Sequence, residues 1–130
     1  MLVVDATVAF DAAFDAVVFD RIEPMDPVGP PLLWSETTAA LRQAAFRGSV
    51  TDYDASTALS RFLSSPIDRR SPRRLYTDAW NLAAQLGWAK TYDAEYIALA
   101  RLLNCPLLTK DGRLGRRAAH LAEIIGPTQL

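Results

Sequence analysis

The chain lacks several residue types on which common kinds of protein site depend. It has one cysteine, Cys105, and one histidine, His120, so it can form neither an internal disulfide nor a cysteine-based zinc site. No nucleophile-elbow motif accompanies the histidine, which argues against a Ser-His-Asp triad. The phosphate-binding patterns GxxxxGK[ST] and GxGxxG are also missing. We therefore expect Cys105 to be a small buried hydrophobe and His120 to be a surface residue.

Long hydrophobic runs are missing as well. No apolar stretch approaches the about 20 residues that a membrane span requires. The opening sequence MLVVDATVAF has an acid at position 5 and lacks the charged and then uninterrupted apolar segments of a signal peptide. Half of the 130 residues are apolar and 22% are charged, a balance typical of a folded chain. We expect a single domain over residues 1–130, without a membrane anchor, in the cytoplasm.

The formal net charge is only −1, but the charges are unevenly distributed. Residues 1–41 contain seven acids and one base, whereas residues 42–130 contain eight acids and 13 bases. The first third of the chain is therefore acidic and the remainder is basic. This asymmetry is compatible with a metal site beside a site for a polyanion, and equally with an ordinary solvated surface.

Short apolar segments alternate with helical patterns along the chain. The apolar segments predict strands at Leu2–Val4, 66–70, 106–109 and 123–126. Helical spacing and capping residues predict helices at 7–18, 33–46, after Thr51, at 75–86, after Thr91 and in the basic segment after Asp111. The proline-rich stretch 23–31 is expected to be a loop. The alternation predicts an α/β fold, a three-layer α/β/α sandwich with a short parallel central sheet.

Four acids fall where such a fold builds its active sites. Asp5 follows the first strand and Asp111 follows the 106–109 strand, and ligand sites of parallel sheets lie outside the carboxyl ends of the strands. Glu36 lies in WSETTAALR near the start of a helix, and Asp93 lies two residues after Thr91. Each acid also has a purely structural interpretation, as a helix cap or a solvated side chain.

Considered together, the four acids indicate a hard divalent cation. Neighbouring carboxylates repel one another, and a buried carboxylate is costly unless a cation neutralises it. Oxygen ligands without a histidine or cysteine cluster favour Mg²⁺ or Mn²⁺ over zinc. Such an ion lowers the pKa of a bound water and stabilises an in-line displacement at phosphorus. The pattern therefore favours hydrolysis of a phosphodiester.

The sequence resembles the PIN-domain nucleases, in particular the VapC-type toxins of prokaryotic toxin–antitoxin pairs. The motifs LVVDATV, WSETTAALR, TYDAEYIALA and LLTKDGRL carry the resemblance, in that order and over essentially the whole chain. The resemblance implies a PIN-like fold in which Asp5, Glu36, Asp93 and Asp111 bind Mg²⁺ or Mn²⁺ and Thr109 supports the pocket. It also implies an endoribonuclease, commonly a homodimer, that a small VapB-like antitoxin holds inactive. Operator DNA would be bound only through that antitoxin.

Two basic groups could contact an RNA backbone. Arg113, Arg116 and Arg117 closely follow the last of the four acids, and the segment DRRSPRR at 68–74 forms the other group. We expect the first group to bind RNA, although both could be ordinary solvated surface. Tyr92 and Tyr96 are expected in the core. The three tryptophans and the broad apolar surface of the 73–104 helical pair favour a homodimer.

Two other hypotheses remain open at this point. A receiver-like signalling domain would also bind Mg²⁺ in an acidic pocket, but it needs paired acids near the first strand, and Asp5 has no acidic neighbour. A PIN fold could also serve in RNA processing or as a non-catalytic binding module. Only an activity assay distinguishes this second alternative from a toxin.

Overall fold

A five-stranded parallel sheet, in the order β3-β2-β1-β4-β5, forms the centre of the computed structural model, which describes residues 1–130. Its strands are β1 (Leu2–Val4), β2 (Pro27–Gly29), β3 (Asp68–Arg69), β4 (Leu107–Leu108) and β5 (Ile124–Ile125). Every neighbouring pair of strands is parallel. The carboxyl ends of all five strands therefore meet at one edge of the sheet.

Seven α-helices and two short 3-10 helices connect these strands. The α-helices are α1 (Ala6–Phe14), α2 (Ala16–Ile22), α3 (Leu32–Phe46), α4 (Asp52–Leu63), α5 (Leu75–Leu86), α6 (Tyr92–Leu103) and α7 (Gly112–Ala118). The 3-10 helices are η1 (Glu23–Met25) and η2 (Pro127–Gln129). None of the helices is long and apolar enough to cross a membrane.

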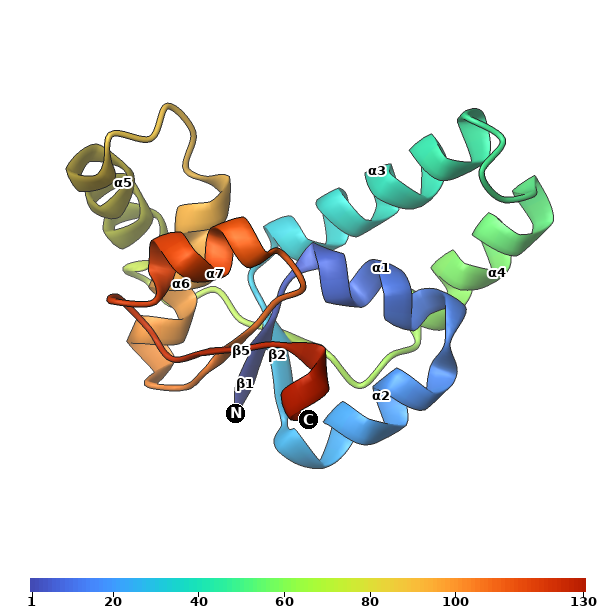
Figure 1. Cartoon of the computed structure of the whole chain (residues 1–130), viewed down its shortest axis with the longest axis horizontal. Coiled ribbons are helices and arrows are strands. Elements are labelled where there is room, and N and C mark those ends of the chain that lie inside the picture. Colours follow the sequence, from blue (N-terminus) through green and yellow to red (C-terminus); the bar gives the residue numbers. More distant parts are fainter.

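The helices cover both faces of the sheet (Figure 1). Helices α1 to α4 lie on one side and α5 to α7 lie on the other. This division follows from right-handed crossovers, because the chain advances from β1 to β3 in one direction and then returns to β4 and β5 in the other. One cluster of 29 buried residues fills the space between the layers. The predicted α/β/α sandwich is confirmed.

Helices α3 and α4 form the expected helical hairpin, which projects from the body of the molecule (Figure 1). The Thr51 hydroxyl accepts a hydrogen bond from the Asp54 N–H at 3.0 Å and so caps α4 as predicted. Thr91 occupies the capping position of α6, but its hydroxyl donates to Glu95 Oε2 at 3.3 Å instead of capping the helix.

The prediction of a loop over 23–31 is wrong, because this stretch contains η1 and the strand β2. Its prolines concealed the strand. Pro27 is the first residue of β2, a position where a strand tolerates proline, and it pairs with Leu2 of β1. Gly29 permits a close approach of α3, since a Cβ at this position would collide with the side chain of Leu33.

The single helix expected over 7–18 is two helices. Asp15 has an extended backbone, so α1 ends at Phe14. Its side chain then accepts a hydrogen bond from the Val17 N–H at 3.2 Å and caps α2. An aspartate that satisfies the free N–H groups of a new helix stabilises such a break.

The single histidine and the single cysteine can be compared with the exposure that the sequence predicts for them. His120 is a surface residue, as predicted. Cys105 packs against the hydrophobic core but is only partly buried.

Candidate active site

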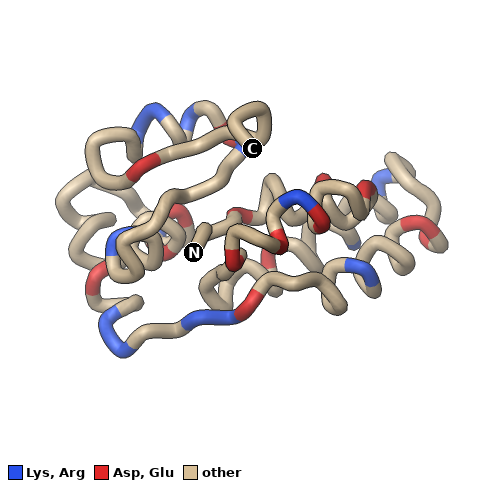
Figure 2. Tube along the Cα trace, turned by 90° about the horizontal axis from the view of Figure 1, so that it is seen from below, with Lys and Arg blue, Asp and Glu red and all other residues tan.

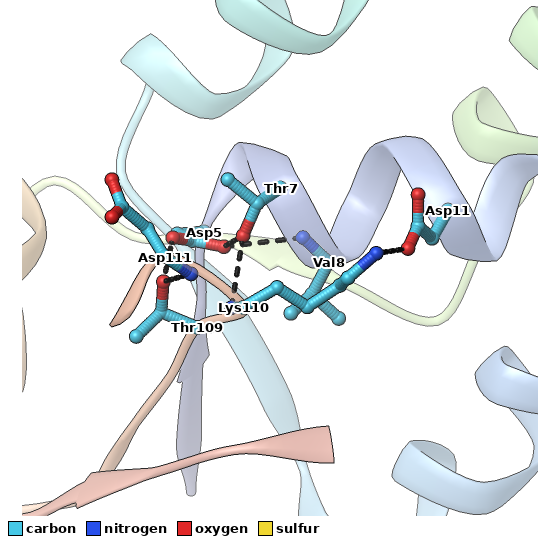
Figure 3. Close-up of polar contacts among 7 residues, drawn as sticks. All are labelled: Asp5, Thr7, Val8, Asp11, Thr109, Lys110 and Asp111. Carbon is cyan, nitrogen blue, oxygen red and sulfur yellow. Dashed lines mark hydrogen bonds and ion pairs between the residues drawn. The ribbon is translucent and has the colours of Figure 1, made fainter. Parts of the chain in front are cut away.

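Asp5 lies at the carboxyl end of β1 and is the N-cap of α1. Its Oδ1 accepts hydrogen bonds from the Thr7 hydroxyl at 2.6 Å and from the Val8 N–H at 3.2 Å. Its Oδ2 accepts a hydrogen bond from the Thr109 hydroxyl (Figure 3). The residue is only 3% exposed, and burial raises the pKa of its carboxyl although these hydrogen bonds act in the opposite direction. The protein therefore fixes this carboxylate in place while making its charge costly.

Thr109 links Asp5 to Asp111. Its buried hydroxyl donates to Asp5 and accepts a hydrogen bond from the Asp111 N–H at 2.9 Å. The link is possible because β1 and β4 are neighbours in the sheet, so their carboxyl ends lie side by side. Thr109 therefore fixes the Asp5 carboxylate relative to the backbone of Asp111.

Asp111 is the N-cap of the short helix α7. Its Oδ1 accepts hydrogen bonds from the Arg113 N–H at 3.0 Å and from the Leu114 N–H at 3.1 Å. Both of these bonds fall on the same oxygen, so Oδ2 is not used in the cap. The capping interpretation is therefore correct for Asp5 and Asp111 alike, and it leaves part of the Asp111 carboxylate for another partner.

Glu36 lies near the start of α3 and is held by a residue from α6. The phenol of Tyr96 donates a hydrogen bond of 2.6 Å to Glu36 Oε1. Burial, together with this bond to a carboxylate, raises the pKa of Tyr96 so far that the phenol keeps its proton. Burial also raises the pKa of Glu36; the bond from Tyr96 lowers it, and the charges of Asp93 and Asp5 raise it further.

Asp93 lies in the first turn of α6, and opposing charges act on it. Burial of the Asp93 carboxyl raises its pKa, and the negative charge of Asp111 raises it further. The positive charges of Arg117 and Arg113 lower it. These two arginines are four residues apart on α7 and therefore share a face of that helix.

The four predicted acids surround one region at the carboxyl edge of the sheet. Charge interactions connect Asp5 with Glu36, Glu36 with Asp93, and Asp93 with Asp111. Carboxylates in this arrangement destabilise one another, and a hard divalent cation would relieve the repulsion. The donor chemistry therefore fits Mg²⁺ or Mn²⁺. However, no three acid, histidine or cysteine side chains converge closely enough to form a ready-made metal site, so the carboxylates would have to turn toward a bound ion.

Several polar partners of these acids could not be recognised from the sequence. Glu95 is a fifth acid, buried in the first turn of α6, and the charge of Glu36 contributes to its raised pKa after burial. Thr7 donates to Asp5 and accepts a hydrogen bond from the Lys110 N–H at 3.0 Å. Tyr96 is buried as predicted, but its bond to Glu36 joins positions 60 residues apart. No local pattern could have indicated that contact.

Tyr92 is not a core residue, contrary to expectation. It is the first residue of α6 and is 50% exposed. The buried part of that helix starts two residues later, at Ala94. Helical spacing assigned Tyr92 to the buried stripe, but the stripe begins at Ala94 and does not include the first residue of the helix.

A pocket of about 630 Å³ opens between α1 and α3 beside the acids. Glu36 and Asp111 line it together with residues of both helices, among them Phe10. Lys110 forms an ion pair with Asp11 within the same pocket lining (Figure 3). A ligand that approaches the acids from this side would therefore meet both a cation and an aromatic ring.

Comparison with known proteins gives a consistent result. Residues 2–120 match the family model described as the PIN domain. Ribonuclease VapC12 of Mycobacterium tuberculosis is 35% identical over 129 residues, which cover 95% of this chain and 97% of that protein. The predicted resemblance is confirmed.

Solved structures share the fold. The crystal structure of PAE2754 from Pyrobaculum aerophilum has a TM-score of 0.78 at 23% identity and covers 98% of this chain and 91% of that chain. VapBC2 from Rickettsia felis, bound to a DNA fragment from its promoter, has a TM-score of 0.63 at 14% identity and covers 97% of this chain and 98% of that chain. The family match, and the pairing of β1 with β4 where a receiver-like sheet would pair it with β3, exclude the receiver-like alternative.

Proposed function

The chain belongs to the PIN domain family, and on that premise we propose that it is a Mg²⁺- or Mn²⁺-dependent endoribonuclease, the toxin of a type II toxin–antitoxin pair. The observation that carries the proposal is the group of four mutually repelling acids at the carboxyl edge of the sheet. Similarity to a ribonuclease over nearly the whole chain supports RNA as the substrate.

In this proposal Asp5, Asp93 and Asp111 hold the ion, and Glu36 either completes its shell or orients the attacking water. A divalent ion bound there would supply a water of lowered pKa and neutralise charge on the scissile phosphate. The protein's own contribution is positioning. Tyr96 fixes one oxygen of Glu36, and the Thr109 hydroxyl fixes Asp5 relative to the backbone of Asp111. No side chain acts as a covalent nucleophile.

Removal of divalent ions tests the mechanism. EDTA should abolish cleavage of single-stranded RNA, and Mg²⁺ or Mn²⁺ should restore it, whereas Ca²⁺ should substitute poorly because it demands a larger and less regular shell. An Asp93→Asn variant purified in parallel detects contaminating nuclease, since only a contaminant would remain active in it. Cleavage that persists in EDTA, and is absent from that variant, would overturn the metal mechanism.

We also propose a VapB-like antitoxin as the partner in the cytoplasm, with operator DNA bound only through it. The likeness to VapBC2, a structure that includes promoter DNA, supports this assignment. A small reading frame immediately upstream, whose product copurifies with this chain and suppresses its ribonuclease activity, is the expected finding. A gene that stands alone would favour a role in RNA processing, and a purified chain that never cleaves RNA would favour a non-catalytic binding module.

A further inference from the structure

A second pocket, of about 420 Å³, lies beside the acids. It is formed by the loop that joins α5 to α6, the start of α6, and α7. Its lining includes Glu36, Trp88, Lys90, Tyr92, Asp93 and Arg117. It shares only Glu36 with the pocket between α1 and α3. The two hollows therefore flank the acids, with the elements of the first on one side of the sheet and the loop of the second on the other (Figure 1).

Two aromatic rings in this second pocket have cations close to them. The guanidinium of Arg117 lies 4.2 Å from the centre of the Trp88 ring. The Lys90 ammonium lies 5.8 Å from the centre of the Tyr92 ring. Proteins that bind single-stranded nucleic acid combine such rings, on which bases stack, with cations that follow the backbone.

Tyr92 is the more exposed of the two rings. Trp88 is partly buried against the core and carries Arg117 over one face. Tyr92 also has a cation, Lys90, over one face, but the residue is half exposed at the start of a helix that is buried from Ala94 onward. A large aromatic surface that the core does not use, directly beside Asp93, is available to a ligand.

Arg117 brings a positive charge to the same pocket as Tyr92 and Asp93. Its contact with Trp88 restrains the guanidinium, and its charge reaches Asp93. A planar guanidinium is suited to grip a phosphate with two hydrogen bonds. The pocket thus offers a ring for a base and a cation for the phosphate next to it.

We propose that the second pocket binds one unpaired nucleobase adjacent to the scissile phosphate, with Tyr92 as the stacking surface and Arg117 as the phosphate contact. The inference rests on the proposed ribonuclease function and names the residues of this chain that would receive a base of the RNA. A base can lie on Tyr92 only if it is free of its complementary strand, so the substrate is a single strand or a loop, and duplex RNA is excluded.

The test measures RNA binding in an Asp5→Asn background, so that the RNA survives. A labelled short single-stranded RNA is titrated by fluorescence anisotropy, in parallel with the same sequence as a duplex. Tyr92→Ala should weaken binding of the single strand about 5- to 150-fold, the range for loss of one stacked base. Tyr92→Phe, which keeps the ring, should restore most of that loss. Tyr53→Ala, at a 78% exposed tyrosine on α4, should have no effect.

An abasic scan identifies the nucleotide involved. Removing the base at one position of the RNA should weaken binding by the same factor as Tyr92→Ala, and the two losses should not add when they are combined. Circular dichroism and the thermal midpoint establish that each variant is folded.

The outcomes separate the two proposals. Unchanged binding in Tyr92→Ala, additive losses at every abasic position, or equal affinity for duplex and single strand would overturn the base-binding pocket while leaving ribonuclease activity of the parent chain intact. A parent chain that neither cleaves nor binds RNA would overturn both proposals.

Discussion

Asp5 meets two requirements that mutation can separate. As the cap of α1 it must present an oxygen to the Val8 N–H. As a proposed metal ligand it must carry a negative charge. Asparagine supplies the oxygen without the charge, and alanine supplies neither. Asp5 can therefore be both a helix cap and a metal ligand. Loss of the cap should lower stability, and loss of the ligand charge should lower the rate of cleavage.

Asp5→Asn should lower the rate of RNA cleavage about 10²- to 10³-fold, equivalent to roughly 3 to 4 kcal/mol of transition-state stabilisation. Its thermal midpoint in metal-free buffer should be equal to or above that of the parent, because burial disfavours the charge that is removed. Asp5→Ala should lose activity and also about 1 kcal/mol of stability. Thr51→Ala removes the cap of α4 and is the matched control, with a similar stability loss and normal cleavage. Full activity in Asp5→Asn would exclude Asp5 as a ligand.

Glu36 should make stability depend on pH in a specific direction. Its pKa is raised in the folded state, by burial first and by neighbouring acids. The folded protein therefore binds this proton more tightly than the unfolded chain does, and its contribution to stability is present at low pH and lost as the pH rises through the folded pKa. Glu36→Gln keeps an acceptor for Tyr96 and removes the charge.

The thermal midpoint of Glu36→Gln should exceed that of the parent at pH 7 in metal-free buffer. The difference should close as the pH falls toward 4.5, the ordinary value for this carboxyl, because the parent then becomes neutral as well. Adding Mg²⁺ should raise the midpoint of the parent more than that of the variant. A variant that is less stable than the parent at neutral pH would mean that the Glu36 charge is stabilising in the metal-free fold.

At the scale of elements, α7 carries three arginines. The positive charges of Arg113 and Arg117 lower the pKa of Asp93. Each arginine that neutralises one phosphate of single-stranded RNA should contribute about 0.7 to the slope of log K against log salt. In the Asp5→Asn background, Arg113→Ala and Arg117→Ala should each reduce the slope by about this amount for unrelated sequences. Arg116→Ala provides the comparison on the same helix, and an equal reduction there would mean that the RNA covers the whole helix.

Elements with a strong local signal could be predicted from the sequence, and elements defined by distant partners could not. The strand β1 is a buried apolar run, and α4 and α5 begin or end at capping residues, so their positions were predictable. The strand β2 consists of Pro27, Val28 and Gly29, a composition typical of a loop. It is a strand because β1 and β3 pair with it on both sides.

The same distinction applies to the candidate site. The four acids could be found because each follows a strand or begins a helix, which is a local property. The contacts that orient them, from Thr109 to Asp5 and from Tyr96 to Glu36, join residues 104 and 60 positions apart. The exposure of Tyr92 was missed for a related reason, since periodicity identifies a buried helix face but does not show where neighbouring elements stop covering it.

At the scale of the whole molecule, the two basic groups are far apart. The 68–74 segment includes β3 at one edge of the sheet, and α7 precedes β5 at the other edge. Figure 2 shows basic positions on opposite sides of the Cα trace. One short RNA bound at the acids would therefore meet the α7 group first.

The last prediction concerns association of two copies. Tyr76 and Trp80 are one helical turn apart on the outer face of α5 and are 56% and 70% exposed. Exposed aromatic residues grouped in this way mark interaction surfaces, and a buried tryptophan commonly contributes about 2 kcal/mol or more to such an interface. We predict that the chain is a homodimer that buries this face of α5. Trp80→Ser should then weaken association roughly 30-fold and yield monomers in light scattering at micromolar concentration. Phe46→Ser, at an 81% exposed residue at the end of α3, removes a comparable exposed aromatic ring from the far end of the molecule and should leave the dimer intact. A parent chain that is monomeric at that concentration, or a dimer lost only in Phe46→Ser, would contradict the prediction.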